Sequence, residues 1–174
     1  VIKKIEELAP LAPLHNPAHI QGINACTKVF GKDVPQVVVF DTAFHQTMPE
    51  KAYMFAIPYK YYENYGIRRY GFHGTSHRYV SQKMAELMGK NIEDTKIITC
   101  HIGNGSSITA IKGGKVIDTS MGLTPVQGLM MGTRAGDVGA GAISYMMSQE
   151  KLTIDQALDI MNKKSGILGI SGKS

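Results

Sequence analysis

The chain has 174 residues, of which 43% are hydrophobic and 19% charged, the ordinary balance of a globular protein. No apolar run approaches the ~18 residues that a membrane-spanning helix needs. The net charge of +5 comes from basic residues scattered in ones and twos, whereas nucleic-acid-binding proteins usually gather them in a stripe. Composition thus argues against a membrane or nucleic-acid-binding protein, and the modest positive excess is compatible with an anionic small substrate.

The first forty residues predict two helices and a strand. Apolar residues recur at helical spacing over 1–9, before two prolines end the pattern. Asn16-Pro17 predicts an N-cap and a helix to about Phe30. Val37–Phe40 predicts a short buried strand with Asp41 at its carboxyl end, where open α/β sheets place ligand chemistry. The chain lacks an initiating Met and starts within a helical pattern, so we expect a fragment or a processed chain.

The middle and end of the chain predict short elements separated by glycines. In chain order we expect an irregular stretch over 42–60, a helix over Tyr59–Tyr65 ended by Gly66, a strand over Arg68–Gly71 and a helix over Thr75–Met88 ended by Gly89. Three strands should follow, over Lys96–His101, Ser107–Lys112 and Lys115–Thr119, the last two joined by a Gly113-Gly114 hairpin. After a glycine-rich loop over 121–138 we expect helices near Gly141–Gln149 and Thr153–Asn162, and no terminal element.

Two cysteines, Cys26 and Cys100, lie far apart and form no C-x-x-C pair. Their apolar neighbours predict free, buried thiols in a reducing cytosol.

The strongest local signal for chemistry is the run from His101 to Ser107, in which a strand enters a tight Gly-Asn-Gly turn. Glycines remove the β-carbons that would keep a phosphate away, and successive N–H groups can then point at its oxygens. Asn104 and the following serines add polar side chains. The alternative is a plain hairpin, because Asn-Gly is also the commonest turn signal.

Three further segments carry candidate side chains. Arg134 lies between glycines in the loop 128–137 and offers a planar fork for phosphoryl or carboxylate oxygens, unless it is a surface arginine in a mobile loop. His73 stands at a predicted helix N-terminus, which favours a substrate anion, and the glycine beside it argues against a zinc site with His77, which we expect to be structural or at the surface. Asp41 could hold Mg²⁺ through water, act as a base, or only cap a turn.

Together and in this order, these segments resemble the acetate kinase family over essentially all 174 residues. The matching strings are LAPLHNP (11–17), FDTAFHQTMP (40–49), GIRRYGFHGTSH (66–77), HIGNGSS (101–107), DTSMGLTP (118–125), MGTRAGD (131–137) and KKSGILGISG (163–172).

The resemblance implies an α/β protein of the actin, sugar-kinase and Hsp70 superfamily, with a ribonuclease H-like mixed sheet and flanking helices. It implies that the chain spans parts of two domains: 1–45 from the N-terminal acetate-side domain and 46–174 from the C-terminal nucleotide-side domain. Members of the family transfer phosphoryl reversibly between ATP and acetate with Mg²⁺, giving acetyl phosphate and ADP. They are usually homodimers, and we expect a cytoplasmic location. Propionate and butyrate kinases are relatives.

The resemblance also implies residue roles. These are a catalytic group of Asp41, His73 and Arg134, nucleotide phosphate contacts at His101, Asn104 and Gly105, and an acetate pocket of Leu14, His15, Phe72 and Pro125. Asp41 is in addition the residue expected to hold Mg²⁺, through water.

Elementary chemistry selects among these roles. Acetate, with a pKa of roughly 4 to 5, is already ionised near neutral pH and needs no base. We therefore favour Asp41 as a metal- or water-positioning group. The family's serine-rich phosphate loop, a second substrate arginine, the adenosine pocket and a glutamate near the metal are all missing from these 174 residues, so we predict negligible activity for them alone. The alternatives are a silent folding or dimerisation fragment, or a sugar kinase, against which the apolar Phe72 and Pro125 argue.

Overall fold

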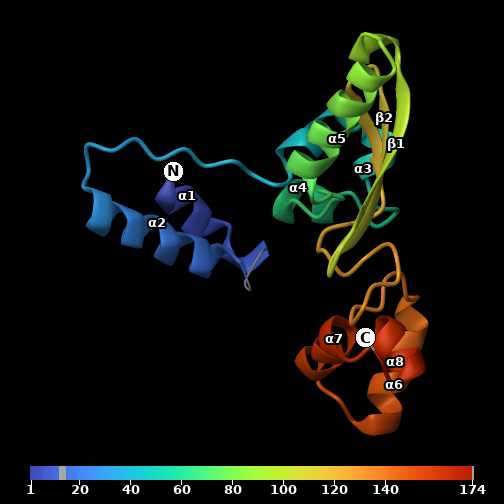
Figure 1. Ribbon diagram of the computed structural model, residues 1–174. Helices are drawn as coiled ribbons and strands as arrows, with labels where there is room; N and C mark the ends of the chain where they lie inside the picture. Colours follow the sequence, from blue (N-terminus) through green and yellow to red (C-terminus); the bar gives the residue numbers. More distant parts are fainter. Residues whose placement is uncertain (12–14, 174) are drawn as a thin grey trace. The chain divides into compact units, whose positions relative to one another are not determined.

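The computed structural model describes residues 1–11 and 15–173. The chain divides into two compact units, Val1–Phe40 and Asp41–Ser174 (Figure 1). This division lies a few residues before the predicted domain boundary at 45/46, which stays a prediction. No helix in the described ranges is long and apolar enough to cross a membrane.

The first unit contains the two predicted helices, α1 (Ile2–Glu7) and α2 (Asn16–Phe30), with a short 3₁₀ turn η1 (Ala9–Leu11). The predicted N-cap is wrong by one residue: Asn16 is already helical, and its side-chain amide donates to the carbonyl of Ile5 at 3.3 Å.

The predicted strand over Val37–Phe40 is wrong for this structure. The segment is extended but carries no strand pairing, and the side chains of Val37 and Val39 are 86% and 72% exposed. A strand exists only where a neighbour takes up its backbone hydrogen bonds, and the described residues of this unit supply no other strand.

The second unit is built on three antiparallel strands in the order β1-β2-β3. These are β1 (Lys96–Ile102), β2 (Ser106–Lys112) and β3 (Lys115–Thr119). All three were predicted and are confirmed, as is the hairpin: Gly113 and Gly114 have φ of +58° and +73°, which L side chains rarely adopt.

One face of this sheet is covered. Helix α5 (Gly74–Leu87) packs against β1, and the 3₁₀ helix η2 (Ala43–Thr47) packs against β3 and α5. A small apolar core lies on that face, where Ile111 and Val116 pack with Met48.

The remaining part of the covered face is polar. The strand register places Thr99 opposite Thr109, and Thr109 opposite Thr119, while Ser107 lies opposite His101. The three threonines and Ser107 are at most 5% exposed. A buried row of hydroxyls needs hydrogen-bond partners from whatever covers it, and here these are histidines.

The other face of β1 is open. Ile98 and Ile102 are 71% and 69% exposed, and Cys100 between them is exposed as well. Cys26 is also exposed, so the prediction of buried thiols is wrong, although both cysteines are free. Apolar neighbours along a strand do not bury a side chain unless another layer packs on its face.

Short elements connect the sheet to the helices. Between η2 and α5 lie α3 (Glu50–Tyr53) and α4 (Lys60–Tyr65), the latter ended by a left-handed Gly66 as predicted. The predicted strand over Arg68–Gly71 is wrong, because its N–H groups donate to Tyr53 and to the loop carbonyl of Gly122 rather than to a strand. A 3₁₀ turn, η3 (Ile92–Asp94), precedes β1.

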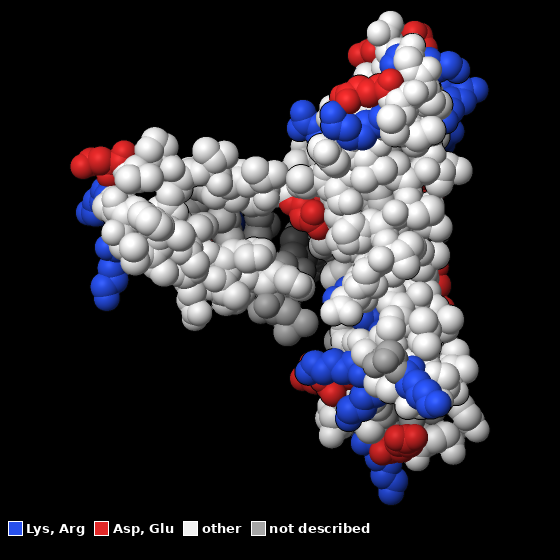
Figure 2. All heavy atoms as spheres, viewed as in Figure 1, with Lys and Arg blue, Asp and Glu red and all other residues white. Residues whose placement is uncertain are grey.

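The chain ends in three helices, α6 (Ala140–Glu150), α7 (Ile154–Lys163) and α8 (Gly166–Ser171). The first two were predicted, and α7 starts with a complete capping box between Thr153 and Gln156. Helix α8 was not predicted. In the second unit charged side chains gather around the β2–β3 hairpin and around these C-terminal helices, and few lie between these two places (Figure 2).

Candidate active site

The site begins where Asp41 holds the first turn of α5. His73, the residue before the helix, adopts a left-handed conformation with φ 61° and ψ 26°, which is uncommon for any residue except glycine. Its N–H donates to the Asp41 carboxylate at 2.6 Å, and the N–H of Gly74 donates to the Asp41 carbonyl at 2.8 Å. These two bonds stabilise the unusual turn and orient His73.

The ring of His73 stacks on His101 of β1, with centroids 4.0 Å apart and an interplanar angle of 19°. Its Nδ1 lies 2.8 Å from the Ser107 hydroxyl, and His101 Nδ1 lies 2.9 Å from the Ser76 hydroxyl. Burial lowers the pKa of His73, as do the neighbouring His101 and Arg134, against an opposing effect of Asp41. This environment favours a neutral imidazole.

Gly105 separates His73 from Arg134. A β-carbon at Gly105 would lie 3.1 Å from Arg134 Nη1 and 3.1 Å from His73 Nε2. A cation and an imidazole nitrogen, from two distant parts of the sequence, therefore converge on the same point of the hairpin. Only glycine leaves that point open.

The loop that carries Arg134 is bonded to the rest of the second unit through its backbone. The N–H of Met131 donates to the Arg134 carbonyl at 3.0 Å, and that of Ala135 donates to Met161 of α7 at 2.9 Å. The start of α8 packs so closely that a β-carbon at Gly166 would collide with the carbonyl of Met131. The guanidinium itself donates to the Pro125 carbonyl at 3.2 Å. The backbone thus fixes the place from which Arg134 extends.

A polar pocket of about 410 Å³ opens beside this arginine. Its lining residues are Asn104, Gly132, Thr133, Arg134 and Asn162. Its volume falls in the range of small-molecule sites. A cationic guanidinium among neutral polar groups suits an anionic ligand.

The hairpin turn uses part of its backbone internally. The N–H of Gly103 donates to the carbonyl of Gly105 at 3.1 Å, and the Ser106 hydroxyl donates to the carbonyl of Gly103 at 3.3 Å. The Gly103 amide is therefore already bonded within the loop, and an anion here would rely on Asn104 and the converging His73 and Arg134.

The sequence profile of the acetokinase family matches residues 1–174. The chain belongs to the acetokinase family. It is 63% identical to an acetate kinase of Thermoanaerobacter pseudethanolicus over 174 residues, which are all of this chain and 43% of the relative. It is 62% identical to acetate kinase 2 of Clostridium perfringens, again over all of this chain and 44% of the relative.

Solved structures agree. The crystal structure of Porphyromonas gingivalis acetate kinase superposes with a TM-score of 0.92 at 56% identity, covering 98% of this chain and 43% of that one. A propionate kinase from Francisella tularensis superposes with a TM-score of 0.94 at 48% identity, covering 99% of this chain and 44% of that one. The predicted fold class is thus confirmed, and this acetokinase chain spans less than half the length of the relatives it matches.

The acetokinase residues predicted from the sequence fall into two groups. Brought together in the second unit are Asp41, His73, His101, Asn104, Gly105, Pro125 and Arg134. Phe72 is partly buried and directly precedes His73. His15 is exposed in the first unit, where its ring lies 6.3 Å from His19, and Leu14 lies outside the described residues.

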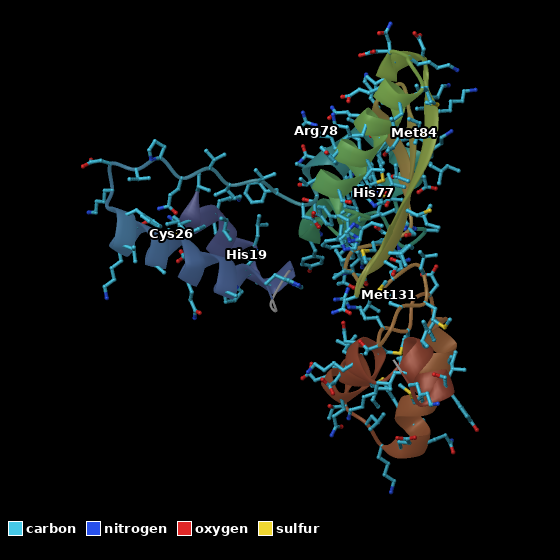
Figure 3. All side chains as sticks on the ribbon, in the orientation of Figure 1. His19, Cys26, His77, Arg78, Met84 and Met131 are labelled. Atoms are coloured by element: carbon cyan, nitrogen blue, oxygen red, sulfur yellow. The ribbon has the colours of Figure 1, made fainter. Side chains whose placement is uncertain are left out.

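Sequence reasoning missed two polar residues beside Arg134. Thr133 and Asn162 line the pocket, and nothing in the local sequence around Asn162 marks it. His77 lies on α5 (Figure 3). It was expected to be structural or at the surface, and it is structural, with 1% of it exposed.

Two buried histidines near the site are strongly perturbed. Burial lowers the pKa of His77 to about 4, and burial likewise lowers the pKa of His45 to about 4. The two rings lie edge to face, with centroids 5.8 Å apart. Both are therefore neutral near pH 7, and they serve the buried hydroxyls as hydrogen-bond partners.

Proposed function

We propose that the protein to which this chain belongs is an acetate kinase, which transfers phosphoryl reversibly from ATP to acetate and yields acetyl phosphate and ADP. The observation that carries this proposal is the convergence of Arg134 Nη1 and His73 Nε2 at Gly105, beside the pocket that Asn104 lines. Membership of the acetokinase family supports it.

The chemistry requires charge neutralisation more than proton transfer. An acetate oxygen attacks the γ-phosphorus, the new carbon-bound oxygen–phosphorus bond forms, and the bond to the bridging oxygen of ADP breaks. The acetate is already ionised, so no base is needed, but two anions must meet. Arg134 is the fixed cation of the described site, and we assign to it the main stabilisation of the transferring phosphoryl group, with His73 beside it.

Asp41 is compatible with a role in holding Mg²⁺. One of its carboxylate oxygens accepts the His73 N–H, and no group of three or more potential metal ligands occurs in the described parts of the chain. Mg²⁺ needs no such group, because it keeps several waters and binds through one or two carboxylates together with substrate phosphates. When bound, the ion would neutralise charge on the phosphates. Asp41 would hold a water of its shell while fixing the His73 turn.

His101, Asn104 and Gly105 are proposed to lie around the nucleotide phosphates, and Leu14, His15, Phe72 and Pro125 around the acetate methyl. The Arg134 bond to the Pro125 carbonyl supports a link between the charged and apolar parts of the site. The structural similarity to a propionate kinase favours propionate as a second substrate.

A cytoplasmic location and a homodimer are also proposed. Two free, exposed cysteines suit a reducing compartment. The homodimer rests on the resemblance to the family, and light scattering of the full-length protein tests it.

The decisive experiment measures acetyl phosphate formation by the full-length protein with ATP, Mg²⁺ and acetate, propionate or butyrate in parallel. Acetate should give the highest kcat/KM. A full-length protein without turnover on any of the three acids would refute the proposal. Retention of configuration with a chiral phosphate would exclude direct in-line transfer, and turnover at an enzyme-like rate by the 174 residues alone would contradict the expectation that further residues are required.

A further inference from the structure

A buried chain of hydrogen bonds leads from His73 into the protein. The Ser107 hydroxyl, on a side chain that is fully buried, lies 2.8 Å from His73 Nδ1 and 2.7 Å from His77 Nε2. A hydroxyl carries a single proton. Among the described residues the buried Ser107 hydroxyl has no hydrogen-bond partner besides these two rings, so its proton goes to one ring and it accepts from the other, and the proton positions of the two histidines are coupled.

The far end of the chain sets the direction. The Thr99 hydroxyl lies 2.7 Å from His77 Nδ1, and it donates to the carbonyl of its cross-strand partner Thr109 at 3.5 Å. With its proton used in this way, Thr99 accepts from His77 Nδ1–H. The carbonyl can only accept, so the chain has a definite end.

The proton count then runs outward from Thr99 to His73. His77 is 1% exposed and neutral, because burial together with the neighbouring His45, His73 and His101 lowers its pKa to about 4, against an opposing effect of Asp41. A neutral imidazole has one N–H, so its Nε2 accepts from Ser107. Ser107 in turn accepts from His73 Nδ1–H.

We propose that Ser107, His77 and Thr99 are positioning residues that fix the tautomer of His73, with its proton on Nδ1 and a lone pair on Nε2. The Nε2 atom is the one that converges with Arg134 on Gly105. The tautomer can be measured whatever the protein does, whereas its effect on phosphoryl transfer rests on the proposed function.

This arrangement has a consequence for an anion at the site. As a neutral ring, His73 can donate from Nε2 only after each donor and acceptor in the chain has exchanged roles. That reversal gives up the Thr99 bond to Thr109, which at 3.5 Å is the longest of the chain and the weakest. The form with the His73 proton on Nδ1 is therefore the one that keeps every hydrogen bond of the chain.

The test is nitrogen NMR of ¹⁵N-labelled histidine rings in the full-length protein, near neutral pH and without substrate. The two neutral tautomers and the imidazolium ion give distinct ring-nitrogen shifts. We expect His73 to carry its proton on Nδ1. A proton on Nε2, or on both nitrogens, overturns the proposal, and this measurement requires no variant.

Thr99→Val provides the second arm. It removes the hydroxyl, so His77 would keep a buried N–H without a partner unless its proton moves to Nε2 and is donated to Ser107. Ser107 then donates to His73 Nδ1, and His73, the third residue along the chain of bonds from Thr99, switches to the Nε2–H form. An unchanged His73 tautomer in folded Thr99→Val contradicts the coupling.

Thr95→Val is the matched control. Thr95 and Thr99 are both 4% exposed, but the Thr95 hydroxyl donates to the carbonyl of Ile92 at 2.7 Å, outside the chain. The control should leave His73 on Nδ1, and a switch there as well would show a general disturbance and overturn the assignment. Acetyl phosphate formation is assayed separately: its absence, together with the expected tautomers, refutes the proposed function alone.

Discussion

Gly105→Ala is the substitution whose expected effect follows most directly from the structure. The added methyl group would lie 3.1 Å from both Arg134 Nη1 and His73 Nε2. Favourable contacts between such atoms begin near ~3.5 Å. Each of the two groups must therefore move about 0.4 Å away from the added methyl group. Each is held by its own contacts, because Arg134 Nη1 donates to the Pro125 carbonyl, and the His73 ring stacks on His101 and is bonded to Ser107.

The expected cost is that of overpacking a well-filled site, about 1–3 kcal/mol. Because these groups are assigned to the transferring phosphoryl, much of that cost should fall on the transition state. Since 1.36 kcal/mol corresponds to a factor of ten, we expect kcat/KM for acetyl phosphate formation to fall roughly tenfold to a hundredfold in the full-length protein.

Two glycine variants serve as comparisons. A β-carbon at Gly103, in the same turn, would meet its nearest atoms at 3.6 and 3.7 Å, so Gly103→Ala should lose much less activity. Gly141 lies in α6 with nothing within 4 Å, and Gly141→Ala should retain full activity. A folded Gly105→Ala with kcat/KM within twofold of the parent would refute the convergence of Arg134 and His73 as the functional feature.

Three further predictions concern charge, pH and capping. Arg134→Ala should lower kcat by about 10²–10³-fold in a coupled ADP assay, with partial recovery when guanidinium is added. If the variant keeps its activity without added guanidinium, another group supplies the positive charge on the transferring phosphoryl. The pKa values of His45 and His77 are lowered to about 4 in the folded protein, from 6.5. Their stabilising contribution is therefore complete above pH 6.5 and is lost as the pH falls from 6.5 towards 4, with a slope of about 1.4 kcal/mol per pH unit for each. Urea unfolding of the full-length protein at several pH values should show this loss, and His77→Gln should reduce its slope; an unchanged slope would mean that His77 is not buried in the neutral form. Thr153→Ala removes the capping box of α7 and should lower the free energy of unfolding by about 1 kcal/mol without changing kcat, and no change in stability would mean that the cap contributes nothing.

Local patterns determined the elements whose hydrogen bonds close within a few residues. Helices α2, α5 and α7 were predicted from local signals such as Pro17 at the start of α2 and Gly89 after α5, and the β2–β3 hairpin follows from two adjacent glycines with positive φ. The strands over Val37–Phe40 and Arg68–Gly71 failed for the converse reason. An apolar or β-prone run specifies an extended backbone, but strand pairing requires a partner that the run itself does not encode.

Helix α8 is the converse case, a helix that local sequence does not predict. Its six residues include two glycines and predict no helix, yet their first N–H groups donate to the carbonyls of Met131 and Gly132 in the arginine loop. Contacts from a distant segment therefore supplied what local propensity lacked, and those contacts also fix Arg134.

For the site, the sequence by itself determined the residue types and the family: the glycine hairpin at 101–107, the arginine between glycines, the histidine at a helix start and the aspartate before it. Only the tertiary structure decided that His73 and Arg134 meet at Gly105. It also decided that one chain of hydrogen bonds leads from His73 through Ser107 and His77 to Thr99. The physical reason is that a hydrogen-bond chain depends on strand register and on helix packing across the sheet. Both bring together residues far apart in sequence, and neither is visible in the spacing of any one segment.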